Sequence, residues 1–219
     1  MRTPFLITIG FCAVFSLACS RTEPRIDYGS LELFYYPPVA GGTIPVERYS
    51  FFVLPYDDDG VENLGELYLY HDREGLSWKL EDTDWVKVEE DNKTWIGSRN
   101  ISMPFNERLP RGQFRAVLVN KAGEKTEKLL AYDGPVTPHH PYPFFSFTDG
   151  KYNIDSQYPV NRFICYDSMG EVNNIVAIQN AEGTLRDIRV SNNVFSMALW
   201  AEDEERKVSA VTAAISLRD

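Results

Sequence analysis

The histidines are the first candidates for chemistry, because imidazole is the side chain whose ordinary pKa lies nearest neutral pH. His71 precedes Asp72 at the expected end of a strand. Adjacent strand residues point to opposite faces, so this pair cannot easily form a base and its orienting carboxylate, and we expect a solvated histidine in a turn. His139 and His140 lie between prolines, and no Cys, Asp or Glu follows at metal-ligand spacing before Asp149. We interpret the two as part of a linker.

An acidic stretch at residues 57–66, with the sequence DDDGVENLGE, resembles a calcium loop of the EF-hand kind. The third, fifth, sixth and twelfth places of such a loop are matched by Asp57, Asp59, Gly60 and Glu66. The first place is Pro55, which has no side-chain oxygen, and the flanking segments are typical of strands. We therefore favour an acidic hairpin turn over a weak calcium site, and we predict no metal site and no cofactor.

Aromatic side chains are frequent, with 13 Phe, 12 Tyr and 4 Trp. Such rings could form a stacking platform for sugars or peptides, although on half-buried strands we favour core packing for most of them. Exposed aromatics would indicate a binding surface. The candidates are Tyr35, Tyr36, Trp78, Trp85, Trp95 and Tyr142.

Known catalytic and nucleotide-binding motifs are absent from the sequence. It contains no G-x-S-x-G elbow, no G-x-G-x-x-G, no P-loop and no H-E-x-x-H. Cys165 lies in an apolar stretch at residues 162–166, with no adjacent cation or His to lower its pKa, and we expect a small buried core residue. We predict that the protein is not an enzyme.

Residues 1–18 have the organisation of a secretion signal. Arg2 supplies a short positive region, and residues 4–17 contain no charge. The apolar run is shorter than the ~20 residues of a membrane-spanning helix, but it has the length of a signal-peptide core. The sequence becomes polar after Cys19. We expect export of the chain and removal of the signal.

The segment Leu17-Ala18-Cys19 resembles the lipobox of bacterial lipoproteins, with Ser16 where Leu is commonest. The resemblance implies that the Cys19 thiol receives a diacylglycerol, that cleavage precedes Cys19, and that acyl chains anchor the protein in a membrane. Ser20 follows in place of an Asp, which favours the outer membrane. The implied location is the cell envelope, on its periplasmic or surface face. An ordinary secretory signal is the alternative.

The overall charge and the cysteine count narrow the choice of partners and cross-links. The chain has 32 Asp and Glu against 22 Lys and Arg, a net charge of −10. An acidic protein is a poor partner for nucleic acid and for anionic lipid surfaces. Cys12 would leave with the signal and Cys19 would carry lipid. Cys165 would then be alone, so we expect no internal disulfide.

From residue 31 onward, short strand-like runs alternate with turn residues at intervals typical of a sandwich or barrel. No segment before residue 195 has a convincing helical period. Residues 195–215 could form a helix because Ala, Met and Leu are good helix formers. We prefer a terminal hairpin, since β-branched residues dominate its second arm.

Residues 109–123, with the sequence LPRGQFRAVLVNKAG, resemble the end of a fibronectin type III or immunoglobulin-like domain. That family often has a Tyr at the place of Phe114, and the Tyr hydroxyl bonds to the backbone in a tyrosine corner. Phe114 cannot make that bond. As a pattern, the resemblance extends over residues 31–133 and implies an antiparallel β-sandwich.

Four prolines in residues 134–143 indicate a stiff boundary between two parts of the chain. We predict an all-β protein with tandem antiparallel β-sandwich units. The predicted parts are a signal peptide (1–18), a lipidated tether (19–30), a first β-sandwich domain (31–133), a Pro-rich linker (134–143) and a second, smaller β-sandwich domain (144–219). The alternative is one sandwich extended by hairpins, because the last part is small for an independent domain.

Three function hypotheses follow from these features. The first is a membrane-anchored, non-catalytic binding or scaffold module with envelope proteins or glycans as partners. The second is a carbohydrate-binding lipoprotein, which would need a contiguous line of exposed Trp and Tyr. The third is an envelope hydrolase with an unrecognised site, which would need a pocket holding two carboxylates with displaced pKa values.

Overall fold

The computed structural model describes residues 23–188, 190–191 and 193–217, so the predicted signal peptide and Cys19 lie outside the described residues. The regular structure of the described part is almost entirely β-strand, and its helical elements are single 3-10 turns of three residues. The prediction of an all-β fold is therefore confirmed. In the described part of the chain, no helix has the length and apolar character needed to cross a membrane.

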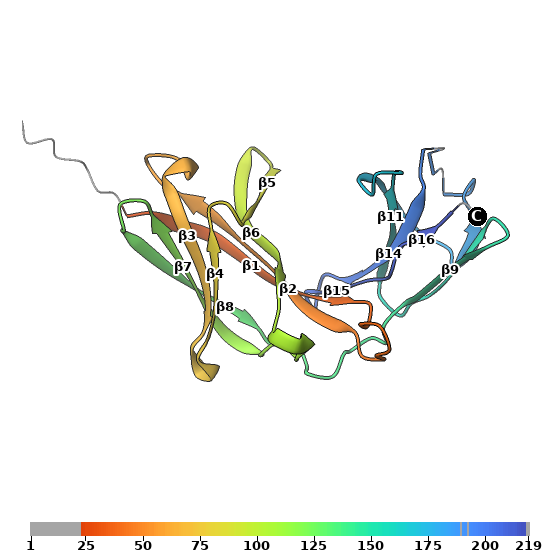
Figure 1. The fold of residues 1–219 in the computed structure, drawn as a ribbon, viewed down its shortest axis with the longest axis horizontal. Coiled ribbons are helices and arrows are strands. Elements are labelled where there is room, and N and C mark those ends of the chain that lie inside the picture. The colour runs from red at the N-terminus through yellow and green to blue at the C-terminus, as the bar shows by residue number, and fades with distance from the viewer. Residues whose placement is uncertain (1–22, 189, 192, 218–219) are drawn as a thin grey trace, which may run out of the picture.

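One nine-stranded sheet runs through the structure (Figure 1). Its strand order is β12-β11-β14-β15-β1-β2-β6-β5, and β16 also pairs with β14. The strands are β1 (Arg25–Tyr36), β2 (Val46–Tyr56), β5 (Val86–Glu90), β6 (Lys93–Ile101), β11 (Val160–Tyr166), β12 (Val172–Ala177), β14 (Ser196–Asp203), β15 (Val208–Val211) and β16 (Ile215–Ser216). All neighbours are antiparallel except β1 and β15, whose parallel pair joins early and late parts of the chain.

Two smaller antiparallel sheets cover one face of the long sheet at different places. The four-stranded sheet has the order β4-β3-β7-β8, and the three-stranded sheet has the order β13-β10-β9. Their strands are β3 (Leu64–His71), β4 (Leu76–Glu81), β7 (Gly112–Asn120), β8 (Lys125–Tyr132), β9 (Phe144–Thr148), β10 (Lys151–Asp155) and β13 (Glu182–Thr184). The result is sandwich-like packing at both ends of the long sheet.

Each sandwich has its own buried core. In the first, Leu33 of the long sheet packs in one cluster with Leu67 and Phe114 of the four-stranded sheet. In the second, Phe163 of the long sheet lies 4.9 Å from Phe145 of the three-stranded sheet, measured between ring centroids. The first core also includes β15 residues, although β15 follows the proline-rich segment in sequence. The parts of the chain before and after the proline-rich segment therefore share the long sheet, and both contribute residues to the first core.

The proline-rich residues 134–143 contain no strand, and side-chain hydrogen bonds hold them against the rest of the fold. The Tyr142 hydroxyl donates to the Val211 carbonyl at 2.7 Å, and Arg108 donates to the Val136 carbonyl at 2.7 Å. Independent folding of the two parts that this segment joins stays a prediction.

The first strand begins six residues earlier than predicted, because β1 starts at Arg25 within the expected tether of residues 19–30. Ile26 is 9% exposed, whereas Arg25 and Asp27 on either side face solvent. The Lys128 ammonium donates to the carbonyls of Ile26 and Asp27, at 3.3 and 2.8 Å. Residues 25–30 have the polar composition of a tether because only one face of this part of β1 is buried.

Two local predictions can be judged directly. The terminal hairpin is confirmed, since β14 and β15 pair in antiparallel register from Trp200 to Asp203. Phe114 lacks the hydroxyl that a tyrosine corner would bond to the backbone. A tyrosine on another strand makes a comparable bond, since the Tyr49 hydroxyl of β2 donates to the Pro110 carbonyl at 2.7 Å. The Tyr49 ring packs edge-on against Phe114 at 5.5 Å.

Candidate functional site: an aromatic groove on the long sheet

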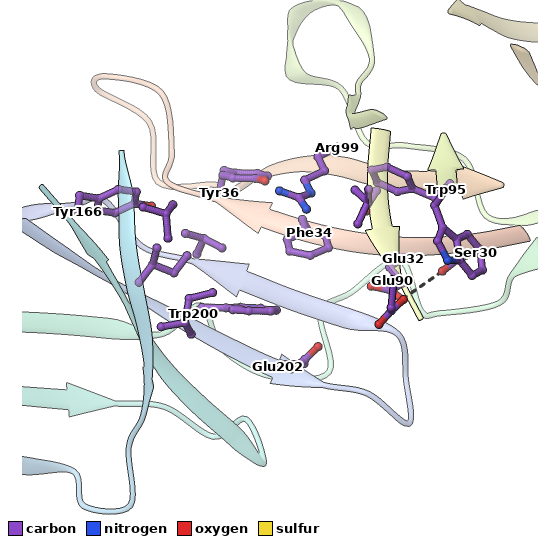
Figure 2. A pocket seen from close by; sticks show the side chains of 17 residues that line it. Ser30, Glu32, Phe34, Tyr36, Glu90, Trp95, Arg99, Tyr166, Trp200 and Glu202 are labelled. Atoms are coloured by element: carbon purple, nitrogen blue, oxygen red, sulfur yellow. Dashed lines mark hydrogen bonds between the residues drawn. The ribbon is translucent and has the colours of Figure 1, made fainter. Parts of the chain in front are cut away.

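The outer face of the long sheet, opposite the two cores, is hollowed into a groove of about 660 Å³ (Figure 2). Side chains from β1, β2, β5, β6, β11, β12, β14 and β15 line it, so both ends of the sheet contribute. We call this feature the sheet groove. Its volume is within the usual range of ligand-binding pockets, about 300–1,000 Å³.

Strand alternation explains how β1 serves the core and the sheet groove together. Leu31, Leu33 and Tyr35 are buried in the first core, at 2%, 0% and 4% exposure. Phe34 and Tyr36 therefore point to the opposite face and line the groove. The last part of this strand is therefore apolar on both faces, whereas Ser30 and Glu32 supply polar groups earlier on the groove face.

The rings on β1 are held in a fixed arrangement. Phe34 and Tyr36 stack with centroids 6.3 Å apart and planes 25° from parallel, and the Arg48 guanidinium lies 4.8 Å from the Tyr36 centroid. Burial raises the pKa of Tyr36, so its hydroxyl stays protonated at neutral pH and can both donate and accept hydrogen bonds. Burial also raises the pKa of Tyr166, which lines the same groove from β11.

Trp200 on β14 is restrained on its edge and on its ring. Its indole N–H donates to the Ser209 hydroxyl at 3.2 Å, and the Arg162 guanidinium lies 5.0 Å from its ring centroid. Arg162 is itself fixed by an ion pair with Glu202. The half-buried indole is therefore presented to the groove in a preorganised position.

Polar groups are spread among these rings. Glu32, Glu90 and Glu202 supply carboxylates, and Arg99 supplies a guanidinium (Figure 2). Glu32 accepts a hydrogen bond from the Ser30 hydroxyl at 3.2 Å. Within the described residues, no carboxylate lies within ion-pair distance of Arg99. The sheet groove thus offers both donors and acceptors beside apolar rings.

The six aromatic candidates from the sequence have different fates. Tyr36 and Trp95 line the sheet groove, whereas Tyr35 and Trp85 are buried in the first core. Trp78 and Tyr142 are partly buried and pack against that core, and the Trp78 indole donates to the Ser102 carbonyl at 2.9 Å. Four further aromatic residues of the groove were not among the predicted candidates, namely Phe34, Phe52, Tyr166 and Trp200. Apolar residues at successive positions near the end of β1 could have indicated that Phe34 and Tyr36 lie on a second apolar face. No feature of the sequence indicated that β11 and β14 complete the groove face.

The acidic stretch forms a turn in which its candidate ligands are engaged separately. Asp57 accepts hydrogen bonds from the Asp59 backbone N–H at 2.9 Å and from the Asn63 amide at 3.2 Å. Glu66 pairs with Lys79 at 2.7 Å and accepts from the Tyr68 hydroxyl at 2.7 Å. A search of the described residues finds no cluster of three or more His, Cys, Asp or Glu that could hold a metal ion.

The expectation of a solvated His71 is wrong. The residue is 1% exposed, its Nε2 lies 3.1 Å from the Arg111 carbonyl, and its ring lies 4.8 Å from Phe114. As the last residue of β3, it points into the core rather than into the following turn. His140 is also engaged, because its Nε2 lies 2.8 Å from an Asp203 carboxylate oxygen. His71 therefore contributes to packing in the first sandwich, and His140 connects the proline-rich segment to β14.

Cys165 is fully buried in the second core, and burial raises the pKa of its thiol to about 11. The thiol is therefore protonated at neutral pH, which agrees with the expected core residue. The predicted lipidation site, Cys19, lies outside the described residues.

Comparison with known proteins gives little further information. No family model matches the chain, and no curated protein matches it. A solved structure of dimeric latent PorU from Porphyromonas gingivalis matches over 89% of this chain at 13% identity, with a TM-score of 0.32. That match covers 20% of PorU, so the chain spans about a fifth of its length.

Proposed function

We propose that this protein is a lipid-anchored lipoprotein of the bacterial cell envelope that acts as a non-catalytic binding module through the sheet groove. The observation that carries the proposal is that several aromatic rings gather in the sheet groove, on the face of the long sheet opposite the cores. Core packing cannot account for these rings, because the cores lie on the other face of the sheet. A partly exposed aromatic surface of this kind is typical of a binding site.

The rest of the proposal rests on the N-terminal sequence. The segment ending in Leu17-Ala18-Cys19 supports export and lipidation, and Ser20 supports the outer membrane. Since β1 begins at Arg25, only a few residues would separate a lipidated Cys19 from the sandwich. A binding face on such a module would work close to the membrane surface, with envelope proteins or glycans within reach.

The proposal can be tested by affinity retention. Immobilised full-length protein is exposed to a detergent extract of the host envelope, and the bound species are compared for wild type and a Tyr36→Ala/Trp200→Ala variant. A matched control is Tyr68→Ala/Tyr70→Ala. Those two rings stack 5.6 Å apart on β3, outside the groove, and have their own cationic neighbours Lys79 and Arg115.

We expect a species retained by wild type and by the control variant to be lost from the groove variant. Equal retention by all three proteins would refute the groove as the binding site. Thermal melting of each variant distinguishes a lost contact from a lost fold.

A further inference from the structure

The floor of the sheet groove excludes recognition through backbone pairing. β11, β14, β15, β1, β2 and β6 each have a paired strand on both sides, so the N–H and C=O groups within these pairs are already used. A peptide that binds by adding a strand needs a free sheet edge. The edge strands of the sheet are β12 and β5, so a ligand that lies on the floor between them is recognised by side chains.

The apolar part of the groove combines flat aromatic rings with Val and Ile side chains, and two of the rings are restrained. Trp200 and Tyr36 are each fixed by a guanidinium, and Trp200 also by its bond to Ser209. The face of an aromatic ring carries partial negative charge and attracts weakly positive C–H groups. One face of a pyranose ring presents several such C–H groups in a plane, so sugar rings match this surface.

The charges in the groove argue against a charged ligand. The carboxylates of Glu32, Glu90 and Glu202, together with the net charge of −10, repel polyanions. Arg99 lies exposed among the rings, and Arg48 and Arg162 lie 4.8 and 5.0 Å from the Tyr36 and Trp200 ring centroids. These guanidinium groups would repel a polycation that approaches the rings, whereas they carry no such penalty for a neutral ligand.

Hydroxyl groups suit the polar groups that remain. A hydroxyl both donates and accepts, so it can donate to Glu32 or Glu90 and accept from Arg99. Resting on the proposed function, we infer that the sheet groove binds a neutral glycan chain, with sugar rings stacked on Tyr36 and Trp200 and sugar hydroxyls bonded to the groove carboxylates and Arg99. The ligand class is a neutral polysaccharide or oligosaccharide.

The test is calorimetric titration of purified full-length protein with four kinds of soluble polymer. These are neutral glycans (β-glucan, mannan and xylan), anionic polygalacturonate, cationic chitosan and a proline-rich peptide. We expect binding of a neutral glycan that is weakened about tenfold or more by Tyr36→Ala or Trp200→Ala. Arg99→Ala, at an exposed side chain, should also weaken binding without lowering the melting temperature. Tyr70→Ala should leave binding unchanged.

The possible outcomes test the glycan inference separately from the proposed binding module. Binding of only a charged polymer or the peptide, lost in the groove variants, would overturn the glycan inference and leave the proposed binding module standing. Glycan binding that is unaffected by all three groove substitutions would overturn the groove as the site. Failure of every neutral glycan to bind would also overturn the inference.

Discussion

Leu33 of β1 and Val208 of β15 are partners in the parallel pair that makes the long sheet continuous. The Leu33 backbone N–H donates to the Lys207 carbonyl at 3.0 Å. Trp200 reaches the sheet groove from one side of this pair, whereas Trp95 reaches it from the other. The geometry of the groove therefore depends on the register between two parts of the chain that are far apart in sequence.

The fragment of residues 20–133 should fold without the rest of the chain. It carries the four-stranded sheet together with β1, β2, β5 and β6, but it exposes the edge of β1 that β15 covers. An uncovered edge invites pairing between chains, so we expect a dispersed amide NMR spectrum, lower stability than the full protein, and self-association as concentration rises. A collapsed, poorly dispersed spectrum would mean that the later strands complete the first sandwich.

The buried ion pair of Glu47 and Arg111 should be important for stability. Arg111 Nη2 lies 2.8 Å from Glu47 Oε1, and the two side chains are 11% and 4% exposed. Glu47 also accepts from the Leu109 backbone N–H at 3.0 Å. Glu47→Ala leaves a buried cation unpaired, so we expect a loss of about 3–5 kcal/mol in the free energy of unfolding, measured by urea denaturation.

A matched control for this substitution is Glu62→Ala, which removes an exposed ion pair with Lys87. That change should leave the urea midpoint almost unchanged, because exposed pairs contribute little. Equal effects of the two substitutions would contradict the structural role assigned to Glu47.

Calcium should have little effect on stability. The Asp57 carboxylate is used within its own turn, Glu66 is paired with Lys79, and Pro55 offers no side-chain ligand. A ligand that binds only the folded state raises the free energy of unfolding by RT ln(1 + [L]/Kd), so a site with a high Kd gives a small shift. A rise of several degrees in melting temperature in millimolar calcium, abolished by Asp59→Ala, would show a real site.

Cys19→Ser should release the protein from membranes. Acyl chains supply the predicted attachment, and the thiol is the atom that receives the first of them. In the native host, we expect the variant in the soluble periplasmic fraction and without label after growth in radioactive palmitate. Retention in membranes with continued palmitate incorporation would rule out the lipobox interpretation.

The sequence predicted local structure better than long-range pairing. Alternation in β7 and the polar turn after β14 identified strands, because both signals lie within a few residues. The burial of His71 could not be predicted, since it depends on Phe114 and the Arg111 carbonyl from a distant strand. The groove was missed for the same reason. Tyr166 and Trp200 become neighbours of the β1 rings only through the β1–β15 pair.

The indole signals of the four tryptophans test the central claim most directly. Trp95 and Trp200 line the sheet groove, whereas Trp78 and Trp85 lie in or against the first core. Each signal is assigned by single Trp→Phe substitution in 15N-labelled protein, which is then titrated with any ligand that binds, beginning with neutral glycans. We predict that the Trp95 and Trp200 signals shift on binding and that the Trp78 and Trp85 signals do not. Saturation with ligand while the Trp95 and Trp200 signals stay in place would contradict the account.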